Sequence, residues 1–316
     1  MFRADGVDSS ASGVRDPSPR VALLFAALLA ALALILGSSL VGPTDAASAA
    51  VPAAKPDKPG GGGGGNGGGK GGGKGGGNGG GTTALQYAAV GDSFAAGAGG
   101  GSYLDTTCDR SSKSYPMLLD GDADKSLVAF PACSGADTSD VIAQAAAVPA
   151  TAKLITVTVG GNDVGFADVM QDCFVLRNTS CQASIDAGAA IAASPGFTQS
   201  IVSVVETLRA QAPGATVIVT GYPLLFWENS SGVNPKYAYA DEVNDETVVL
   251  NDVIQAAAES SGAVFVDVED DFAGHGIGSS SPWITDYVLL NFTSAFHPNP
   301  SGYVAYAAAI RAVPLP

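Results

Sequence analysis

The chain has 316 residues, of which only 14% are charged, and its formal net charge is −15. From Thr82 onward, eight Lys and Arg stand against 25 Asp and Glu, which leaves a balance of −17. A surface of this sign repels phosphate backbones and anionic membranes, so we expect neutral substrates and no nucleic-acid partner.

Residues 1–50 have the pattern of an export signal or a membrane anchor. A polar, arginine-containing start precedes residues 21–41, which carry no charge, and Ala47-Ser48-Ala49 is an A-x-A pattern typical of a cleavage site. The apolar run is also long enough to span a bilayer, so an uncleaved anchor stays open. Both interpretations place the rest of the chain outside the cytoplasm, either secreted or tethered to the outer face of the membrane or cell envelope.

The next segment, residues 51–83, begins with Pro, Ala and Lys and continues as an almost unbroken glycine run. Glycine contributes no side chain to a core, so we expect a disordered linker here. The remaining residues, 84–316, are numerous enough to bury the core of one globular domain.

Within that domain, short apolar runs rich in β-branched residues alternate with helical segments. Runs of this kind are typical of parallel strands buried on both faces. We therefore expect an α/β fold, a three-layer α/β/α sandwich with a central parallel sheet of about five strands. The predicted strands are residues 85–90, 126–130, 153–159, 216–220 and 263–268. The predicted helices are residues 114–119, 139–147, 184–211 in one or two pieces, 240–260 and 300–311.

Three of the predicted strands end in polar, glycine-rich segments. Gly91-Asp92-Ser93 follows the first strand, Gly135 comes shortly after the second, and Asn162 follows the third. Carboxyl ends of parallel strands meet at one edge of a sheet, which is where ligands bind. A serine hydroxyl, a glycine amide and an asparagine side chain would then supply a nucleophile and oxyanion donors, as acyl transfer requires. Taken alone, Gly-Asp-Ser is equally compatible with a tight turn whose serine caps a helix.

A serine nucleophile needs a base, and the chain has two histidines. His297 lies just before the last predicted helix, and Pro298 keeps its backbone out of the helical region, so the imidazole sits on a defined loop. His275 lies in a stretch with three glycines, which is too pliable to hold a general base firmly. We expect His297 to be the base.

These four blocks, in this order, resemble the SGNH (GDSL) hydrolase family, and in particular its secreted actinobacterial esterases and lipases. The resemblance covers residues 84–316 and implies an SGNH/flavodoxin-like fold. It implies that Ser93 is the nucleophile, and that the Ser93 amide, the Gly135 amide and the Asn162 side chain form the oxyanion hole. His297 would act as general base and then as general acid. Because Ser93 does not lie in Gly-x-Ser-x-Gly, the α/β-hydrolase fold is disfavoured.

The chain departs from the family at the position three residues before the histidine, where many members carry Asp and this chain has Ser294. An imidazole still needs an acceptor at Nδ1 to fix its tautomer. Some secreted relatives use a main-chain carbonyl three residues upstream, so we expect the Ser294 carbonyl to orient His297. Asp286 and Asp271 are weaker candidates for an assisting carboxylate.

The four cysteines are expected to form disulfides, since an exported chain meets an oxidising compartment. The sequence alone allows three pairings; the resemblance and proximity favour Cys108–Cys133 and Cys173–Cys181. A third bridge found in relatives is missing, so we expect the loop at residues 274–281 to be more mobile. With no Cys-x-x-Cys and two histidines, we expect no metal site, and no cofactor is implied.

Two aspartates and several aromatic residues near the expected site are assigned either to the framework of the fold or to the substrate pocket. Asp92 and Asp163 are expected to accept backbone amide hydrogens, and Tyr115 and Tyr222 to belong to the core. Six aromatic residues are either core packing or the lining of an apolar acyl channel: Phe94, Tyr103, Phe166, Phe226, Trp227 and Trp283.

The function these observations favour is that of a secreted serine esterase or lipase acting on neutral carboxylic esters, with acyl-lipid esters preferred. A carbohydrate acetylesterase and a non-catalytic cell-surface binding module on the same fold are the alternatives. We expect a monomer whose partner is its small-molecule or lipid ester substrate, without a stable protein partner.

Overall fold

The computed structural model describes residues 84–289 and 292–315. The predicted signal or anchor at residues 1–50 and the predicted linker at residues 51–83 lie outside the described residues. The core of the fold is a five-stranded sheet in the order β4-β1-β5-β6-β7, in which all paired strands are parallel. The strands are β1 (Leu85–Gly91), β4 (Lys125–Ala129), β5 (Leu154–Thr158), β6 (Thr216–Thr220) and β7 (Val264–Val266).

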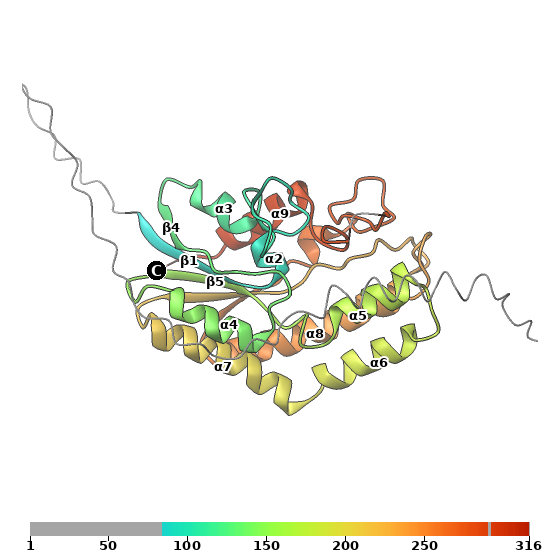
Figure 1. Cartoon of the computed structure of the whole chain (residues 1–316), viewed down its shortest axis with the longest axis horizontal. Coiled ribbons are helices and arrows are strands. Elements are labelled where there is room, and N and C mark those ends of the chain that lie inside the picture. Colours follow the sequence, from blue (N-terminus) through green and yellow to red (C-terminus); the bar gives the residue numbers. More distant parts are fainter. Residues whose placement is uncertain (1–83, 290–291, 316) are drawn as a thin grey trace, which may run out of the picture. The chain divides into compact units, whose positions relative to one another are not determined.

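Helices cover both faces of the sheet, so the predicted three-layer sandwich is confirmed (Figure 1). One face carries α2 (Ser93–Ala96), α3 (Tyr115–Asp120) and α9 (Pro300–Arg311). The other carries α4 (Thr138–Gln144), α7 (Pro195–Gln211) and α8 (Ala240–Ser260). β5 is buried along its whole length, which explains its continuous apolar run.

The long helical segment predicted at residues 184–211 forms two helices, α6 (Cys181–Ala192) and α7. The break falls at Pro195, the first residue of α7, where a missing amide hydrogen is tolerated. The Ser194 hydroxyl caps α7 by accepting from the Phe197 amide at 3.2 Å. No single helix in the described ranges is long and apolar enough to cross a membrane. Among the described helices, only the pair α6 and α7, bent by 61° at their break, has the combined length and apolar composition of a membrane span.

The sequence did not predict the elements between β5 and α6. They are a short helix, α5 (Phe166–Met170), and a π-helical turn, η2 (Gln171–Val175). A small hairpin, β2 (Tyr103–Asp105) with β3 (Arg110–Ser111), was also missed. The loop at residues 274–281 is anchored at Ile277, whose carbonyl accepts from the Trp227 amide at 3.0 Å and the Asn234 side chain at 2.7 Å.

Candidate active site

Ser93 stands at the carboxyl end of β1, as the first residue of α2. Gly91 makes the tight exit from the strand: its φ is +132°, and a Cβ there would lie 2.4 Å from the Thr158 carbonyl oxygen, so no other residue fits. The Asp92 side chain caps α2 by accepting from the Phe94 amide at 2.9 Å. The serine is thereby held on a fixed turn, and 6% of it is exposed.

His297 reaches Ser93 from a loop 204 residues later in the chain. Its Nε2 lies 2.7 Å from the Ser93 Oγ, a direct hydrogen bond. Two backbone bonds pin the loop to Thr285, one from the Thr285 amide to the His297 carbonyl and one from the Phe296 amide to the Thr285 carbonyl, both 2.8 Å. On the far side, Asn299 caps α9 by accepting from the Ser301 amide at 2.9 Å. The imidazole is therefore fixed from both sides.

The acceptor at Nδ1 is a backbone carbonyl, as expected, but the expected residue was wrong. Nδ1 lies 2.7 Å from the Ala295 carbonyl oxygen, whereas the Ser294 carbonyl lies beside Gly99. The cause is Phe296, whose φ of +61° turns the chain so that the carbonyl two residues before His297 faces the ring. Because this acceptor is in place, the Nδ1–H tautomer leaves Nε2 free to accept the serine proton.

Neither candidate carboxylate reaches the imidazole. Asp286 forms an ion pair with Lys236 and accepts from the Tyr237 hydroxyl at 2.8 Å. Asp271 lies beside β7 and α9, where it shares a surface depression with Val264 and Ala308. The second histidine, His275, is also elsewhere, stacked on Trp283 with ring centroids 3.6 Å apart.

The environment of His297 is apolar. The rings of Phe94 and Phe166 have centroids 5.0 and 6.0 Å from the imidazole. Burial lowers the pKa of His297 to about 4, against the opposing effect of its bond to the Ala295 carbonyl. The imidazole is therefore neutral, and able to act as a base, at every pH well above that value.

The three expected oxyanion donors line the pocket that contains Ser93 and His297, a cavity of about 260 Å³. The Asn162 side chain donates one hydrogen to the Ala136 carbonyl at 2.9 Å, which leaves its second hydrogen for a ligand. The structure gives neither the Ser93 amide nor the Gly135 amide an acceptor among the residues it describes. All three groups therefore have a hydrogen without a partner among the described residues and belong to residues that line one pocket.

Asp163 fastens the two loops that carry Gly135 and Asn162. It accepts from the Thr138 amide at 3.1 Å and from the Thr138 hydroxyl at 2.5 Å. Because Thr138 begins α4, this clamp joins the end of β5 to the helix that follows the glycine loop. Burial raises the pKa of Asp163, and its bonds to Thr138 oppose that rise.

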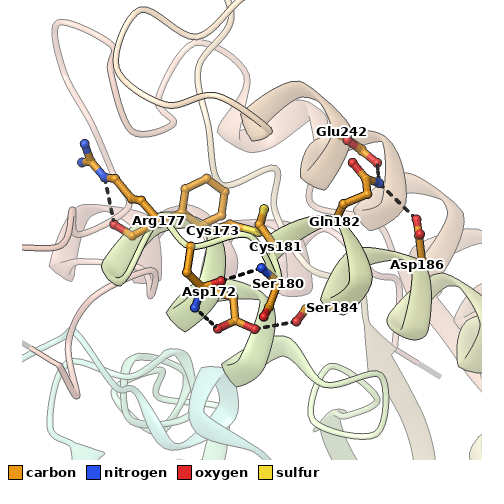
Figure 2. The surroundings of a disulfide bond; sticks show 11 residues. Asp172, Cys173, Arg177, Ser180, Cys181, Gln182, Ser184, Asp186 and Glu242 are labelled. Atoms are coloured by element: carbon orange, nitrogen blue, oxygen red, sulfur yellow. Dashed lines mark hydrogen bonds between the residues drawn. A yellow bond between two sulfur atoms is a disulfide. The ribbon is translucent and has the colours of Figure 1, made fainter. Parts of the chain in front are cut away.

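Both predicted disulfides are confirmed. Cys108–Cys133 joins the hairpin region to the loop just before Gly135, and the Ser134 amide donates to the Cys108 carbonyl at 3.0 Å. Cys173–Cys181 joins η2 to the start of α6. Figure 2 shows this second bridge with Asp172, which accepts from the Ser184 hydroxyl at 2.6 Å. Residues close to each bridge, Ser134 and Gln171 among them, line the pocket that contains Ser93 and His297.

Of the six aromatic residues considered for an acyl channel, only Phe166 lines the pocket that contains Ser93 and His297. Phe94 packs behind it against His297, and Phe226 is buried in the core. The apolar lining that the sequence did not reveal comes from α5, η2 and the loop before His297: Met170, Val175, Tyr287, Phe292 and Phe296. Their only sequence signal was proximity to blocks already identified.

The chain is similar to known lipases and acylhydrolases. Residues 89–305 match the model of the GDSL-like lipase/acylhydrolase family. A lipase of Streptomyces rimosus is 36% identical over 225 residues, covering 69% of this chain and 82% of that protein. Lipase 1 of Streptomyces coelicolor is 34% identical over 221 residues, covering 68% and 81%.

Two crystal structures show the same architecture. The extracellular lipase of S. rimosus matches with a TM-score of 0.67 and 33% identity, and the match covers 73% of this chain and 100% of that one. Phospholipase A1 of Streptomyces albidoflavus NA297 has a TM-score of 0.65 and 33% identity, covering 72% and 99%. Since the family model spans most of the described chain and the relatives match across it, the chain belongs to the GDSL-like lipase/acylhydrolase family of carboxylic ester hydrolases.

Proposed function

We propose that Ser93 and His297 form a catalytic dyad that hydrolyses neutral carboxylic esters through an acyl-enzyme. The observation that carries the proposal is the 2.7 Å bond between the Ser93 Oγ and the His297 Nε2, made inside a pocket that Gly135 and Asn162 also line. A nucleophile bonded to a base that a third group orients is the arrangement expected for covalent acyl transfer.

In the first half-reaction, the Ser93 oxygen attacks the ester carbonyl and its proton passes to Nε2 of His297. The carbonyl oxygen becomes an oxyanion that accepts hydrogen bonds from the Ser93 and Gly135 amides and the Asn162 side chain. The intermediate then collapses, the bond to the alcohol breaks, and Nε2 returns the proton to the leaving oxygen.

In the second half-reaction, water replaces the alcohol. Nε2 of His297 takes a proton from the water, the hydroxide attacks the acyl-enzyme, and the same donors stabilise the second oxyanion. Collapse breaks the ester bond to Ser93, and the proton on Nε2 restores the serine hydroxyl. The products are a carboxylic acid and an alcohol, and the dyad returns to its starting state.

The pocket favours an apolar acyl group. Phe166, Met170 and Val175 line one wall, and Tyr287 and Phe296 line another. Apolar linings of this kind bind apolar ligands, with few polar groups to fix their orientation. Two relatives are named lipases and a third is named a phospholipase A1, which supports an acyl-lipid ester as the substrate.

We propose that the chain works outside the cytoplasm as a monomer. Secretion is supported by the similar S. rimosus enzyme, which is described as extracellular. Two disulfides are consistent with an oxidising compartment. Whether residues 1–50 are cleaved or retained as an anchor decides between a free and a tethered enzyme.

Turnover of p-nitrophenyl esters by the wild type and two variants tests the proposal. We expect Ser93→Ala and His297→Ala each to lower kcat by about 10³-fold or more in folded protein. Tyr87→Phe, which removes a buried hydroxyl from the same strand far from the pocket, should leave kcat unchanged. Equal rates in the wild type and both dyad variants would leave only a non-catalytic binding role.

A further inference from the structure

Tyr222 is a buried residue at the carboxyl end of β6, the fourth strand to contribute to this edge of the sheet. The sequence assigned it to the core, and the mechanism above gives it no step. Its hydroxyl nevertheless makes two hydrogen bonds to the loops that hold the oxyanion donors. It accepts from the Gly161 amide at 2.9 Å and donates to the Asp92 carboxylate at 2.6 Å.

Each of those partners is next to a donor in the chain. Gly161 precedes Asn162, whose side chain faces the pocket, and Asp92 precedes Ser93, whose amide is the second donor. The other oxygen of Asp92 caps the helix that begins at Ser93 by accepting from the Phe94 amide. One hydroxyl therefore bridges two loops that are far apart in the sequence.

The remainder of Tyr222 is fixed, so the bridge has a defined length. Its amide donates to the Asn251 side chain and its carbonyl accepts from the same side chain, both at 2.8 Å. Its ring meets that of Phe94 edge-on at 5.0 Å. Gly161 lies so close that a Cβ there would be 3.2 Å from the Tyr222 hydroxyl oxygen.

We propose that Tyr222 is a positioning residue whose hydroxyl sets the separation between the Ser93 amide and the Asn162 side chain in the oxyanion hole. The inference rests on the proposed function, because it concerns the geometry of that hole. Burial raises the pKa of Tyr222 well above its usual value, so the hydroxyl keeps its proton and donates throughout the working range.

Loss of the hydroxyl leaves the Gly161 amide and the Asp92 carboxylate buried without this partner, and the loops relax apart. Loss of a whole oxyanion donor costs about 10²- to 10³-fold in kcat. For Tyr222→Phe, which displaces donors without deleting one, we expect kcat to fall by about 10- to 100-fold. KM should stay within about twofold, because substrate binding in the ground state does not use these donors.

A double-mutant cycle with Asn162→Ala separates positioning from general destabilisation. If Tyr222 acts through Asn162, Tyr222→Phe should cost at most about twofold in the Asn162→Ala background. The matched control is Tyr87→Phe, which removes another buried hydroxyl, bonded to Thr156 at 2.6 Å. We expect it to lower the melting temperature without changing kcat. Each rate is divided by the concentration of active enzyme, measured by titrating Ser93 with an organophosphonate. A preparation that contains unfolded protein is then not mistaken for a slow variant.

Gly161→Ala is a second test, to be used if Tyr222→Phe does not fold. It changes the distance between the Tyr222 hydroxyl and the loop that carries Asn162, and it keeps the hydroxyl. We expect a loss in kcat of the same order with KM nearly unchanged. An unchanged kcat in both folded variants, or equal losses for Tyr222→Phe with and without Asn162, would overturn the inference. Turnover that survives Ser93→Ala would instead overturn the proposed function, so the two failures are distinguishable.

Discussion

The low pKa of the buried histidine predicts an unusual pH dependence. Burial lowers the pKa of His297 from 6.5 to about 4, a net cost of about 3 kcal/mol for forming the imidazolium in this site. His297 must be neutral to accept the serine proton, so activity is lost only as the pH falls through the pKa that His297 has in the free enzyme. We expect the acid limb of kcat/KM for a soluble short-chain ester to have its midpoint near pH 4.

Phe166→Ala perturbs that burial. Phe166 is one of two rings against His297, with ring centroids 6.0 Å apart, and it lines the same pocket as His297. Admitting water to one face of the imidazole should restore roughly one pKa unit, because desolvation is the largest cause of the shift. The acid limb should therefore move up by about one pH unit.

The control is Tyr287→Ala, which enlarges the same pocket while its ring contacts Phe296 and Phe292 rather than the imidazole. It should leave the limb in place. Asp92 and Asp109 also lie near the dyad, and burial raises the pKa of each. If either carboxylate causes a limb of the pH profile, that limb disappears when the residue is replaced by Asn. A midpoint at 6.5 or above that remains in both Asn variants, or equal shifts in Phe166→Ala and Tyr287→Ala, would refute the reasoning.

Three further predictions follow from the geometry. Ser294→Ala and Asp286→Asn should each keep kcat within about twofold, because the Nδ1 acceptor is a main-chain carbonyl; a 100-fold loss in either folded variant contradicts this. Replacing Cys108 and Cys133 by Ser should lower the free energy of unfolding by about 3.5 kcal/mol, from the 25-residue separation that the bridge closes, as denaturant titration would show. Burial raises the pKa of Asp92 from 3.8 to about 7, so this group stabilises the fold at low pH and that contribution is lost as the pH rises between these values. The unfolding free energy of Asp92→Asn minus that of the wild type should therefore rise with pH, by up to about 4 kcal/mol; a flat difference would contradict the shift.

The sheet could be predicted from the sequence because each strand carries its own signal. β5 is buried on both faces, so its apolar run needs no knowledge of its neighbours. Gly91 could also be predicted from the sequence, because a strand that ends in a tight turn needs backbone angles that favour glycine, and its φ is positive. The family resemblance, which rests on four short blocks in a fixed order, is confirmed. Both disulfide pairings, which the resemblance and proximity favoured, are confirmed as well.

The errors arise where tertiary contacts decide. The Nδ1 acceptor was misplaced by one residue because the direction of a carbonyl depends on the positive φ of Phe296, which bonds to Thr285 hold in place. The π-helical turn η2 supplies pocket residues such as Val175, and a turn of five residues is too short to show a period. Tyr222 was assigned to the core correctly, but its hydroxyl partners come from the segments that follow β1 and β5, which only the fold brings together.

The central claim is that a serine and a late histidine share one pocket as nucleophile and base. Mass mapping after reaction with an organophosphonate tests it directly, with the labelling rate measured in the wild type and in His297→Ala. We predict a single adduct on Ser93, and a rate that falls by about 10³-fold when the base is removed. An adduct on another serine, or labelling of Ser93 at the same rate in both proteins, would contradict the account.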